Sequence, residues 1–328
     1  MPARPTISRV KPPALQSGDT IGVIAPASNI KPELLEAGCD ALHRLGYKTF
    51  YFDSIFEQDL YFAGPVERRA RELEDMFVDP QVRAIICARG GYGANYLLDA
   101  INLEKIRAYP KIFVGYSDVT SLLTYLADAT GLVTFHGPMV TKDFARPDGV
   151  DTPSWESAVR GVSSWAIDTG PNSGVEPLVA GAVEGVLYGG CLSMLAASLG
   201  TPYEIHTAGT ILFIEDVSTK PYQIDRMLMQ LKLAGKLDDV HGIIFGEMLD
   251  CAQKKDQGYT LQEVLLRVVG ELGIPIAWGL RSGHVSRQNV TLPMGVRAAL
   301  EVSSRGVQLK ILEPATAPAL ARSGGLRS

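Results

Sequence analysis

KIFVGYSDVTSLLTYLADATG, residues 111–131, is a complete strand–turn–helix unit. The short run Lys111–Gly115 is apolar, as expected of a buried strand, and Val119–Ala129 has the spacing of an amphipathic helix. Ser117 lies between them, where the end of the strand turns into the start of the helix. Repetition of such units builds parallel strands joined by right-handed helical crossovers.

The same alternation runs through the first half of the chain. Further helices are expected at Glu33–Leu45, from Pro65 through Phe77, and from about Ala94 to Ile101. They alternate with apolar strands at Thr20–Ala25, Tyr47–Phe52, Arg83–Ala88 and Leu132–Phe135. This pattern predicts an α/β fold whose first half is a doubly wound parallel sheet.

The second half has a different pattern, in which β-like runs follow one another closely. Helices fit Cys191–Leu199, Tyr222–Ala234 and Leu261–Leu272. Strands are expected at Ala182–Leu187, Thr210–Ile214, Gly242–Phe245, Pro275–Ala277, Val290–Leu292, Ala298–Val302 and Val307–Leu312. We infer a second, smaller α/β domain with a β-rich end.

A proline-rich stretch separates the two halves. We predict an N-terminal domain over residues 1–145, a linker over 146–178, and a C-terminal domain over 179–313. The remaining residues, 314–328, have the composition of a flexible tail.

Composition narrows the classes of function. The formal net charge is −5, and no stripe of Lys and Arg is present to neutralise phosphates, so a nucleic-acid partner is not expected. Cys39, Cys87, Cys191 and Cys251 form no CxxC pair, so we expect reduced thiols and no metal site. No secretory h-region and no run of about 20 apolar residues is found, so we expect a cytoplasmic protein without membrane contact.

Ser117 is the candidate nucleophile. A serine on a sharp strand-to-helix turn resembles the nucleophile elbow, and the backbone N–H of Asp118 lacks an intrahelical partner there, so it is available to an oxyanion. The usual elbow reads G-x-S-x-G, whereas this chain reads Gly115-Tyr116-Ser117-Asp118-Val119 and lacks the last glycine. Helix capping is the competing explanation for a serine at this position.

A serine nucleophile needs a base and an acid that orients the base. His284, in the glycine-bracketed loop GLRSGHVSRQN, follows an apolar strand and is the favoured base, with His136 as its rival. Glu215 follows another apolar strand and is the candidate acid, with Asp216 competing for that role. Open α/β sheets place functional groups at the carboxyl ends of their strands, so these positions are expected to meet there.

The glycine-rich segment RGGYG, residues 89–93, also follows a buried strand. It lacks the G-x-G-x-x-G spacing and the P-loop lysine, so no nucleotide cofactor is expected. Its glycines permit close backbone approach, and Gly91 is a candidate for a second oxyanion N–H beside the elbow. A plain tight turn explains the same residues equally well.

Several of these blocks, taken in order, resemble the LD-carboxypeptidases, a family that includes murein tetrapeptide carboxypeptidases and microcin C self-immunity peptidases. The resemblance covers residues 14–312. It is carried by LQSGDTIGVIAPAS, ARGGYG, GYSD, TFHGP, LYGGCLSMLAASLGTP, LFIEDV, KPYQIDRML and GHVSRQNVTLPMG.

The resemblance implies a metal-free serine peptidase with Ser117, His284 and Glu215 as its triad, and with the amides of Gly91 and Asp118 as oxyanion donors. It also implies an N-terminal flavodoxin-like domain, a smaller C-terminal swivelling β/α domain, and a homodimer. The implied reaction is cleavage of an L,D bond that releases terminal D-alanine from a cytoplasmic murein tetrapeptide.

One residue departs from the family pattern. Cys191 stands where an Asn commonly follows the two glycines of the LYGG block, which affects the expected substrate pocket. Arg89 is our candidate for binding the carboxylate of the substrate. Two alternatives to a muropeptide carboxypeptidase remain: an immunity amidase that cleaves aminoacyl-nucleotide antibiotics, and a non-catalytic protein that binds a small ligand.

Overall fold

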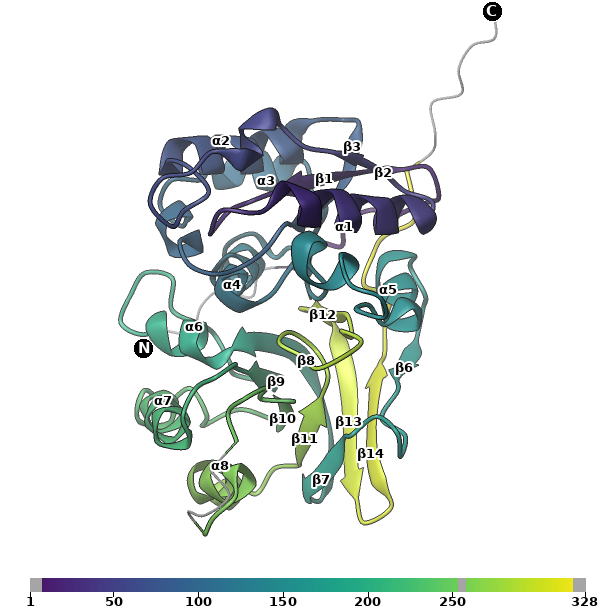
Figure 1. Ribbon diagram of the computed structural model, residues 1–328. Helices are drawn as coiled ribbons and strands as arrows, with labels where there is room; N and C mark the ends of the chain where they lie inside the picture. The colour runs from purple at the N-terminus through teal and green to yellow at the C-terminus, as the bar shows by residue number, and fades with distance from the viewer. Residues whose placement is uncertain (1–7, 253–257, 321–328) are drawn as a thin grey trace, which may run out of the picture.

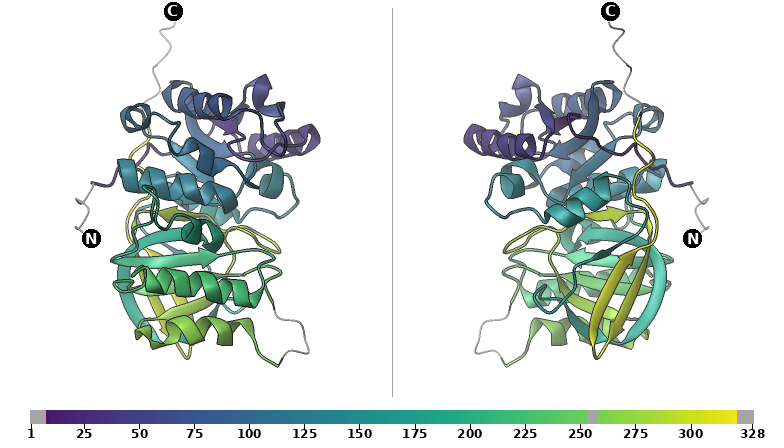
Figure 2. Two further views of the ribbon diagram at one scale, coloured as in Figure 1. Left: turned by 90° about the vertical axis from the view of Figure 1, so that its left-hand side faces the viewer. Right: turned by 90° about the vertical axis from the view of Figure 1, so that its right-hand side faces the viewer.

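The computed structural model describes residues 8–252 and 258–320. It contains two sheets, one built mainly from the first half of the chain and one from the second, which lie above and below each other in Figures 1 and 2. The predicted α/β class is confirmed.

The first sheet has the strand order β12-β5-β4-β3-β1-β2. Its strands are β1 (Thr20–Ile24), β2 (Lys48–Phe50), β3 (Val82–Cys87), β4 (Ile112–Gly115), β5 (Thr134–His136) and β12 (Leu292–Met294). The first five are parallel in the order 2-1-3-4-5, which is the flavodoxin-like order. The sixth, β12, comes from the second half of the chain and pairs antiparallel with β5.

Helices cover both faces of this sheet, as expected of a doubly wound fold. Its helices and short helical turns are α1 (Pro32–Arg44), η1 (Asp53–Phe56), α2 (Val66–Val78), η2 (Ala94–Leu97), α3 (Leu103–Ala108), η3 (Ser117–Val119), α4 (Thr120–Thr130) and η4 (Val140–Phe144). Buried side chains of α1 and η4 pack on one face, and those of α2, α3 and α4 pack on the other. In α1 the buried residues Leu35, Cys39 and Leu42 follow helical spacing, which explains why this segment folds as a helix.

The predicted helix from Ala94 to Ile101 is wrong in length. The segment forms only the short turn η2, which is 3₁₀ rather than α-helical. Its first amide, Ala94 N, donates to the carboxylate of Asp118 at 2.7 Å, so a tertiary contact fixes the start of the turn.

The second sheet has the strand order β6-β14-β13-β8-β9-β10-β11-β7. Strands β8 to β11 are parallel, and the remaining pairs are antiparallel. The strands are β6 (Trp165–Ile167), β7 (Glu176–Val179), β8 (Gly181–Cys191), β9 (Thr210–Glu215), β10 (Gly242–Gly246), β11 (Ile276–Leu280), β13 (Arg297–Ser303) and β14 (Gly306–Ile311). The sheet curls, so that its edge strand β7 contacts β13 and β14.

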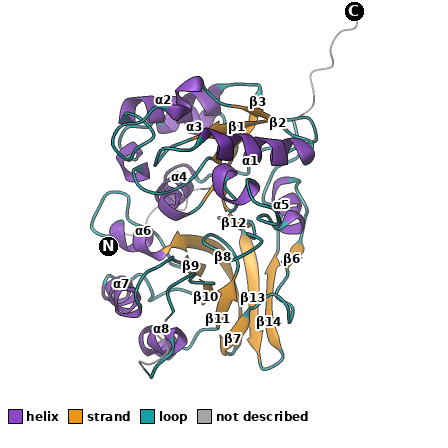
Figure 3. Ribbon diagram, viewed as in Figure 1, coloured by secondary structure: helices purple, strands orange, loops and turns teal. Residues whose placement is uncertain are grey.

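The helices of the second half lie mainly on one face of this sheet. Figure 3 shows α6 (Leu192–Ala197), α7 (Pro221–Leu233) and α8 (Leu261–Val269), which continues into η5 (Gly270–Leu272), together on that side. Within the described residues, no helix is long and apolar enough to cross a membrane.

Two segments outside the predicted domains are packed into the fold. The stretch 146–178 contains α5 (Thr152–Val159) and β6 in full and most of β7, and these two strands form the edges of the second sheet. Residues 314–320 do not form the flexible tail that composition predicted. Ala317 bonds to the backbone of residues 12 and 14, and Ala315 is fully buried, because the end of the chain packs beside its beginning. Residues 321–328 of the predicted tail lie outside the described residues.

Candidate active site

Ser117 stands on a strained turn between β4 and α4. Its φ is +63°, in the left-handed region that costs a residue with a side chain about 1–2 kcal/mol. A serine held this way at the end of a buried strand is the arrangement of a nucleophile elbow, even without the final glycine. The strain is the structural sign that separates this serine from an ordinary helix cap.

The glycine-rich loop after β3 packs directly against the elbow. A Cβ on Gly90 would lie 2.8 Å from Ser117 Cβ, 3.0 Å from its Oγ and 3.3 Å from Asp118 N, so only glycine fits there. Gly91 has a φ of +106° and approaches Ser28. The loop is therefore beside the elbow, as expected, while the oxyanion role of the Gly91 and Asp118 amides stays a prediction.

A buried arginine holds this loop in place. Arg69, on α2, is 1% exposed and donates to the carbonyl oxygens of Pro26 (2.6 Å), Gly93 (2.8 Å) and Gly64 (3.1 Å). The buried carboxylate of Asp118 accepts the Ala94 amide, and burial raises the pKa of Asp118 to about 6 although that hydrogen bond and Arg69 oppose the shift. Together these side chains connect the loop, the elbow and α2.

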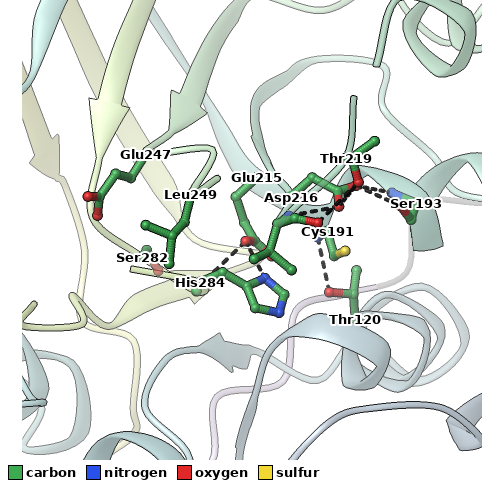
Figure 4. Close-up of polar contacts among 12 residues, drawn as sticks. Thr120, Cys191, Ser193, Glu215, Asp216, Thr219, Glu247, Leu249, Ser282 and His284 are labelled. Atoms are coloured by element: carbon green, nitrogen blue, oxygen red, sulfur yellow. Dashed lines mark hydrogen bonds and ion pairs between the residues drawn. The ribbon is translucent and has the colours of Figure 1, made fainter. Parts of the chain in front are cut away.

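Glu215 and His284 form the strongest polar pair of the site, drawn in Figure 4. Glu215 ends β9 and is fully buried, and its Oε2 accepts from His284 Nδ1 at 2.8 Å and from the His284 backbone amide at 3.1 Å. Burial raises the pKa of Glu215, but His284 and His136 outweigh burial and lower it to about 2. Burial lowers the pKa of His284, but the carboxylate outweighs that effect, so the net shift is upward.

The Glu215–His284 pair contacts the elbow through Tyr116. The ring of Tyr116, next to the nucleophile in sequence, packs edge-on against the His284 ring with centroids 5.1 Å apart. Nδ1 of His284 is bound to Glu215, which leaves Nε2 for the serine. Within residues 8–252 and 258–320, no hydrogen bond joins the Ser117 hydroxyl to His284, and such bonds often form only with substrate bound.

Asp216 has a different task from its neighbour. Its Oδ2 accepts from Ser193 N (2.9 Å) and Ser193 Oγ (2.7 Å), and its Oδ1 accepts from Val217 N and Thr219 Oγ1, both at 2.8 Å (Figure 4). These bonds fix the turn after β9 to the start of α6. The geometry therefore favours Glu215 over Asp216 as the partner of the imidazole.

His136, the rival base, lies on the far side of Glu215. It ends β5, is fully buried, and contacts Ser282 Oγ through Nδ1 at 2.9 Å. Its Nε2 lies 3.8 Å from Glu215 Oε1. Both histidines considered from the sequence are thus at the site, one on each oxygen of the same carboxylate.

Cys191 and Arg89 are the two residues that the sequence linked to the substrate pocket. Cys191 is buried, its amide donates to Thr120 Oγ1 at 3.1 Å, and burial raises the pKa of its thiol (Figure 4). Arg89 is exposed and donates to Asn29 O at 3.2 Å, so its predicted contact with a substrate carboxylate stays a prediction.

Sequence reasoning missed three charged residues near the site. Arg69 lies in a charged helical segment where nothing distinguishes it from its neighbours. Lys142, on η4, is exposed and close enough to oppose the raised pKa of His284. Glu247 follows β10 and accepts the Ser286 amide at 3.0 Å; its place at the end of a strand is the signal that was available. In the described part of the chain, no three His, Cys, Asp or Glu side chains are placed to hold a metal ion.

Comparison with known proteins matches both halves of the chain to family models. The LD-carboxypeptidase N-terminal domain matches residues 21–137, and the LD-carboxypeptidase C-terminal domain matches residues 184–300. A Bacillus subtilis (strain 168) protein named "probable murein peptide carboxypeptidase" is 40% identical over 299 residues, which are 90% of this chain and 92% of that protein.

Solved structures with the same fold include two relevant proteins. The muramoyltetrapeptide carboxypeptidase from Oxalobacter formigenes superposes with a TM-score of 0.80 at 30% identity, over 92% of this chain and all of that one. The microcin C7 self-immunity protein MccF of Escherichia coli, in complex with aspartyl sulfamoyl adenosine, superposes with a TM-score of 0.85 at 27% identity, over 94% and 100%.

Proposed function

Because this chain belongs to the LD-carboxypeptidase family, we propose that it is a serine carboxypeptidase that releases terminal D-alanine from a murein tetrapeptide. The bond cleaved is the L,D-peptide bond. A cytoplasmic location belongs to the same proposal.

The proposed mechanism uses side chains that the two sheets supply jointly. Ser117 Oγ attacks the scissile carbonyl while His284 Nε2 removes its proton, and the imidazolium then gives that proton to the leaving amine. Glu215 orients the ring and stabilises its charge. The amides of Gly91 and Asp118 stabilise the oxyanion. Water then hydrolyses the acyl-enzyme, with His284 removing a proton from the water and returning it to Ser117 Oγ.

The observation that carries this proposal is the Glu215–His284 bond of 2.8 Å, placed against the elbow through Tyr116. A histidine with Nδ1 fixed by a buried carboxylate keeps Nε2 basic and outward, which is what a hydroxyl nucleophile requires. In the proposal that nucleophile is Ser117, whose left-handed backbone is typical of an elbow serine.

Mass spectrometry of the protein incubated with L-Ala-γ-D-Glu-meso-diaminopimelate-D-Ala tests the proposal. We expect loss of one alanine from the peptide. Ser117→Ala should lower kcat by at least about 10³-fold with an unchanged fold, since the residue supplies the nucleophile. Ser121→Ala, one turn further along α4, is the matched control and should retain activity. Equal activity in Ser117→Ala and the native protein would refute the mechanism.

The similarity to MccF favours a second candidate function, hydrolysis of an aminoacyl-nucleotide amide. The two substrates separate the candidates when offered together at equal concentration. Preferential release of alanine from the muropeptide supports the carboxypeptidase, whereas preferential cleavage of an aminoacyl sulfamoyl adenosine supports the amidase.

A further inference from the structure

Two imidazoles flank the carboxylate of Glu215, and the mechanism above uses just one of them. We propose that the other, His136, is a positioning residue that binds the second oxygen of Glu215 and so fixes the acid of the triad from the side of the first sheet. This inference rests on the function proposed above.

The contact is carried by two buried atoms that face each other. His136 Nε2 and Glu215 Oε1 are 3.8 Å apart, and neither has another hydrogen-bond partner among the described residues. Buried polar atoms are almost always hydrogen-bonded, so we expect these two neighbouring atoms to bond to each other. A bridging water with bonds of about 2.8 Å holds its two partners about 4.5 Å or more apart, so no water fits between them. A small closure of the gap makes the bond direct.

The Ser282 hydroxyl, which can donate or accept, adapts to whichever tautomer of His136 the carboxylate selects. Its Oγ lies 2.9 Å from His136 Nδ1. Because Nε2 faces a carboxylate, the favoured tautomer has its hydrogen on Nε2, and the Ser282 hydroxyl then donates to Nδ1. The serine thus keeps His136 oriented as a donor toward Glu215.

Ser282, Gly283 and His284 act on the carboxylate as one segment. Gly283 has a φ of +92°, and a Cβ there would lie 2.7 Å from Glu215 Cδ and 2.8 Å from His136 Cε1. The bare glycine lets the segment pass against both side chains. Of its two neighbours, Ser282 contacts His136, and His284 binds Glu215 and supplies the base.

Among the described residues, Glu215 is the carboxylate that lies against His136. The titratable side chains in contact with it are Glu215 from β9 and Tyr116 from the turn after β4, whose ring centroid is 6.0 Å away. His284, from the loop after β11, binds the other oxygen of Glu215. The remaining ring contact, Phe213 at 5.1 Å, is apolar. Removing His136 therefore changes chiefly the charge that Glu215 presents to His284.

The direction of that change follows from the shared carboxylate. Without the second donor, more of the negative charge of Glu215 acts on His284, which favours the protonated imidazole. Protonated His284 cannot accept the serine proton, so the acid limb of kcat/KM should move to higher pH. The ring orientation also loosens, which lowers kcat more than it changes KM.

The experiment compares His136→Leu, His136→Gln and Ser282→Ala with the native protein, using alanine release across the pH range. His43→Gln, on the exposed side of α1, is the control. We expect His136→Leu to lower kcat about tenfold, with KM within about twofold, and to raise the acid limb by at least about half a pH unit. His136→Gln, which keeps a neutral N–H donor at this reach, should restore both values, and Ser282→Ala should shift the limb in the same direction by less.

Each outcome decides the inference. An acid limb that stays in place in His136→Leu and Ser282→Ala overturns it, and so does a His136→Gln protein as inactive as His136→Leu, since that result makes His136 the base. If His136→Leu does not fold, the Gln and Ser282→Ala variants decide. Titration of the histidine ring protons by NMR in the Ser117→Ala background reads the pKa of His284 without turnover. It therefore tests the inference even if the native protein releases no alanine and the proposed function fails.

Discussion

Substituting alanine for Gly283 tests the geometry at the centre of the site. The new Cβ would lie 2.7 Å from Glu215 Cδ, 2.8 Å from His136 Cε1 and 2.9 Å from Glu215 Oε2. Both of these side chains are fully buried, so they have little room to move away. The left-handed backbone adds about 1–2 kcal/mol of strain, and overpacking adds about 1–3 kcal/mol. We therefore expect Gly283→Ala to lower the free energy of unfolding by about 2–5 kcal/mol and to lower kcat sharply, because the Glu215–His284 pair must move.

A second glycine separates the two contributions. Gly273 has a φ of +69°, but a Cβ there would meet nothing within 4 Å, so Gly273→Ala carries the backbone strain alone. Urea unfolding should show a loss of about 1–2 kcal/mol for this control, with kcat unchanged. If Gly283→Ala loses no more stability than Gly273→Ala and turns over normally, then Glu215 and His136 do not enclose residue 283 and the site is wrongly placed.

Two further predictions concern the carboxylates. Glu215→Ala should lower kcat by at least about 10³-fold, because the carboxylate orients His284. Asp216→Ala should mainly lower the midpoint of thermal unfolding, because its carboxylate fixes the turn to α6. Steady-state kinetics and thermal unfolding that show the opposite assignment would exchange the two roles. Burial raises the pKa of Asp118 from 3.8 to about 6, so its ionisation lowers the free energy of unfolding by up to about 3 kcal/mol as the pH rises through that interval. Asp118→Asn should therefore be more stable than the native protein at pH 8 but not at pH 4. Unfolding curves that show the same difference at both pH values would contradict this.

Local periodicity predicted most of the fold. The alternation of apolar strands and amphipathic helices indicated the doubly wound first sheet, and the structure confirms it. Ser117, Glu215 and His284 were selected because each follows a short apolar strand, and the structure brings Glu215 and His284 into contact and places the turn of Ser117 beside them. Strand ends are local features, which explains why sequence reasoning reached them.

What sequence reasoning missed depends on contacts between distant segments. The strand expected at Val290–Leu292 is displaced: β12 spans Leu292–Met294. It joins the first sheet, and no local pattern specifies which sheet a short strand enters. Arg69 looks like its charged neighbours on α2, and only tertiary burial makes it the anchor of the loop after β3. Whether His136 or His284 would meet Glu215 was open for the same reason, and the structure places both there.

The position of β12 has a consequence for how the molecule is made. After forming most of the second sheet, the chain returns and closes the outer side of β5, where Leu292 pairs with His136 itself. During synthesis that side stays open until the chain has been made as far as β12, and an unpaired strand edge can pair with other chains. A truncated gene product ending before Leu292 would leave this edge exposed, so we expect it to aggregate rather than accumulate as an independent half.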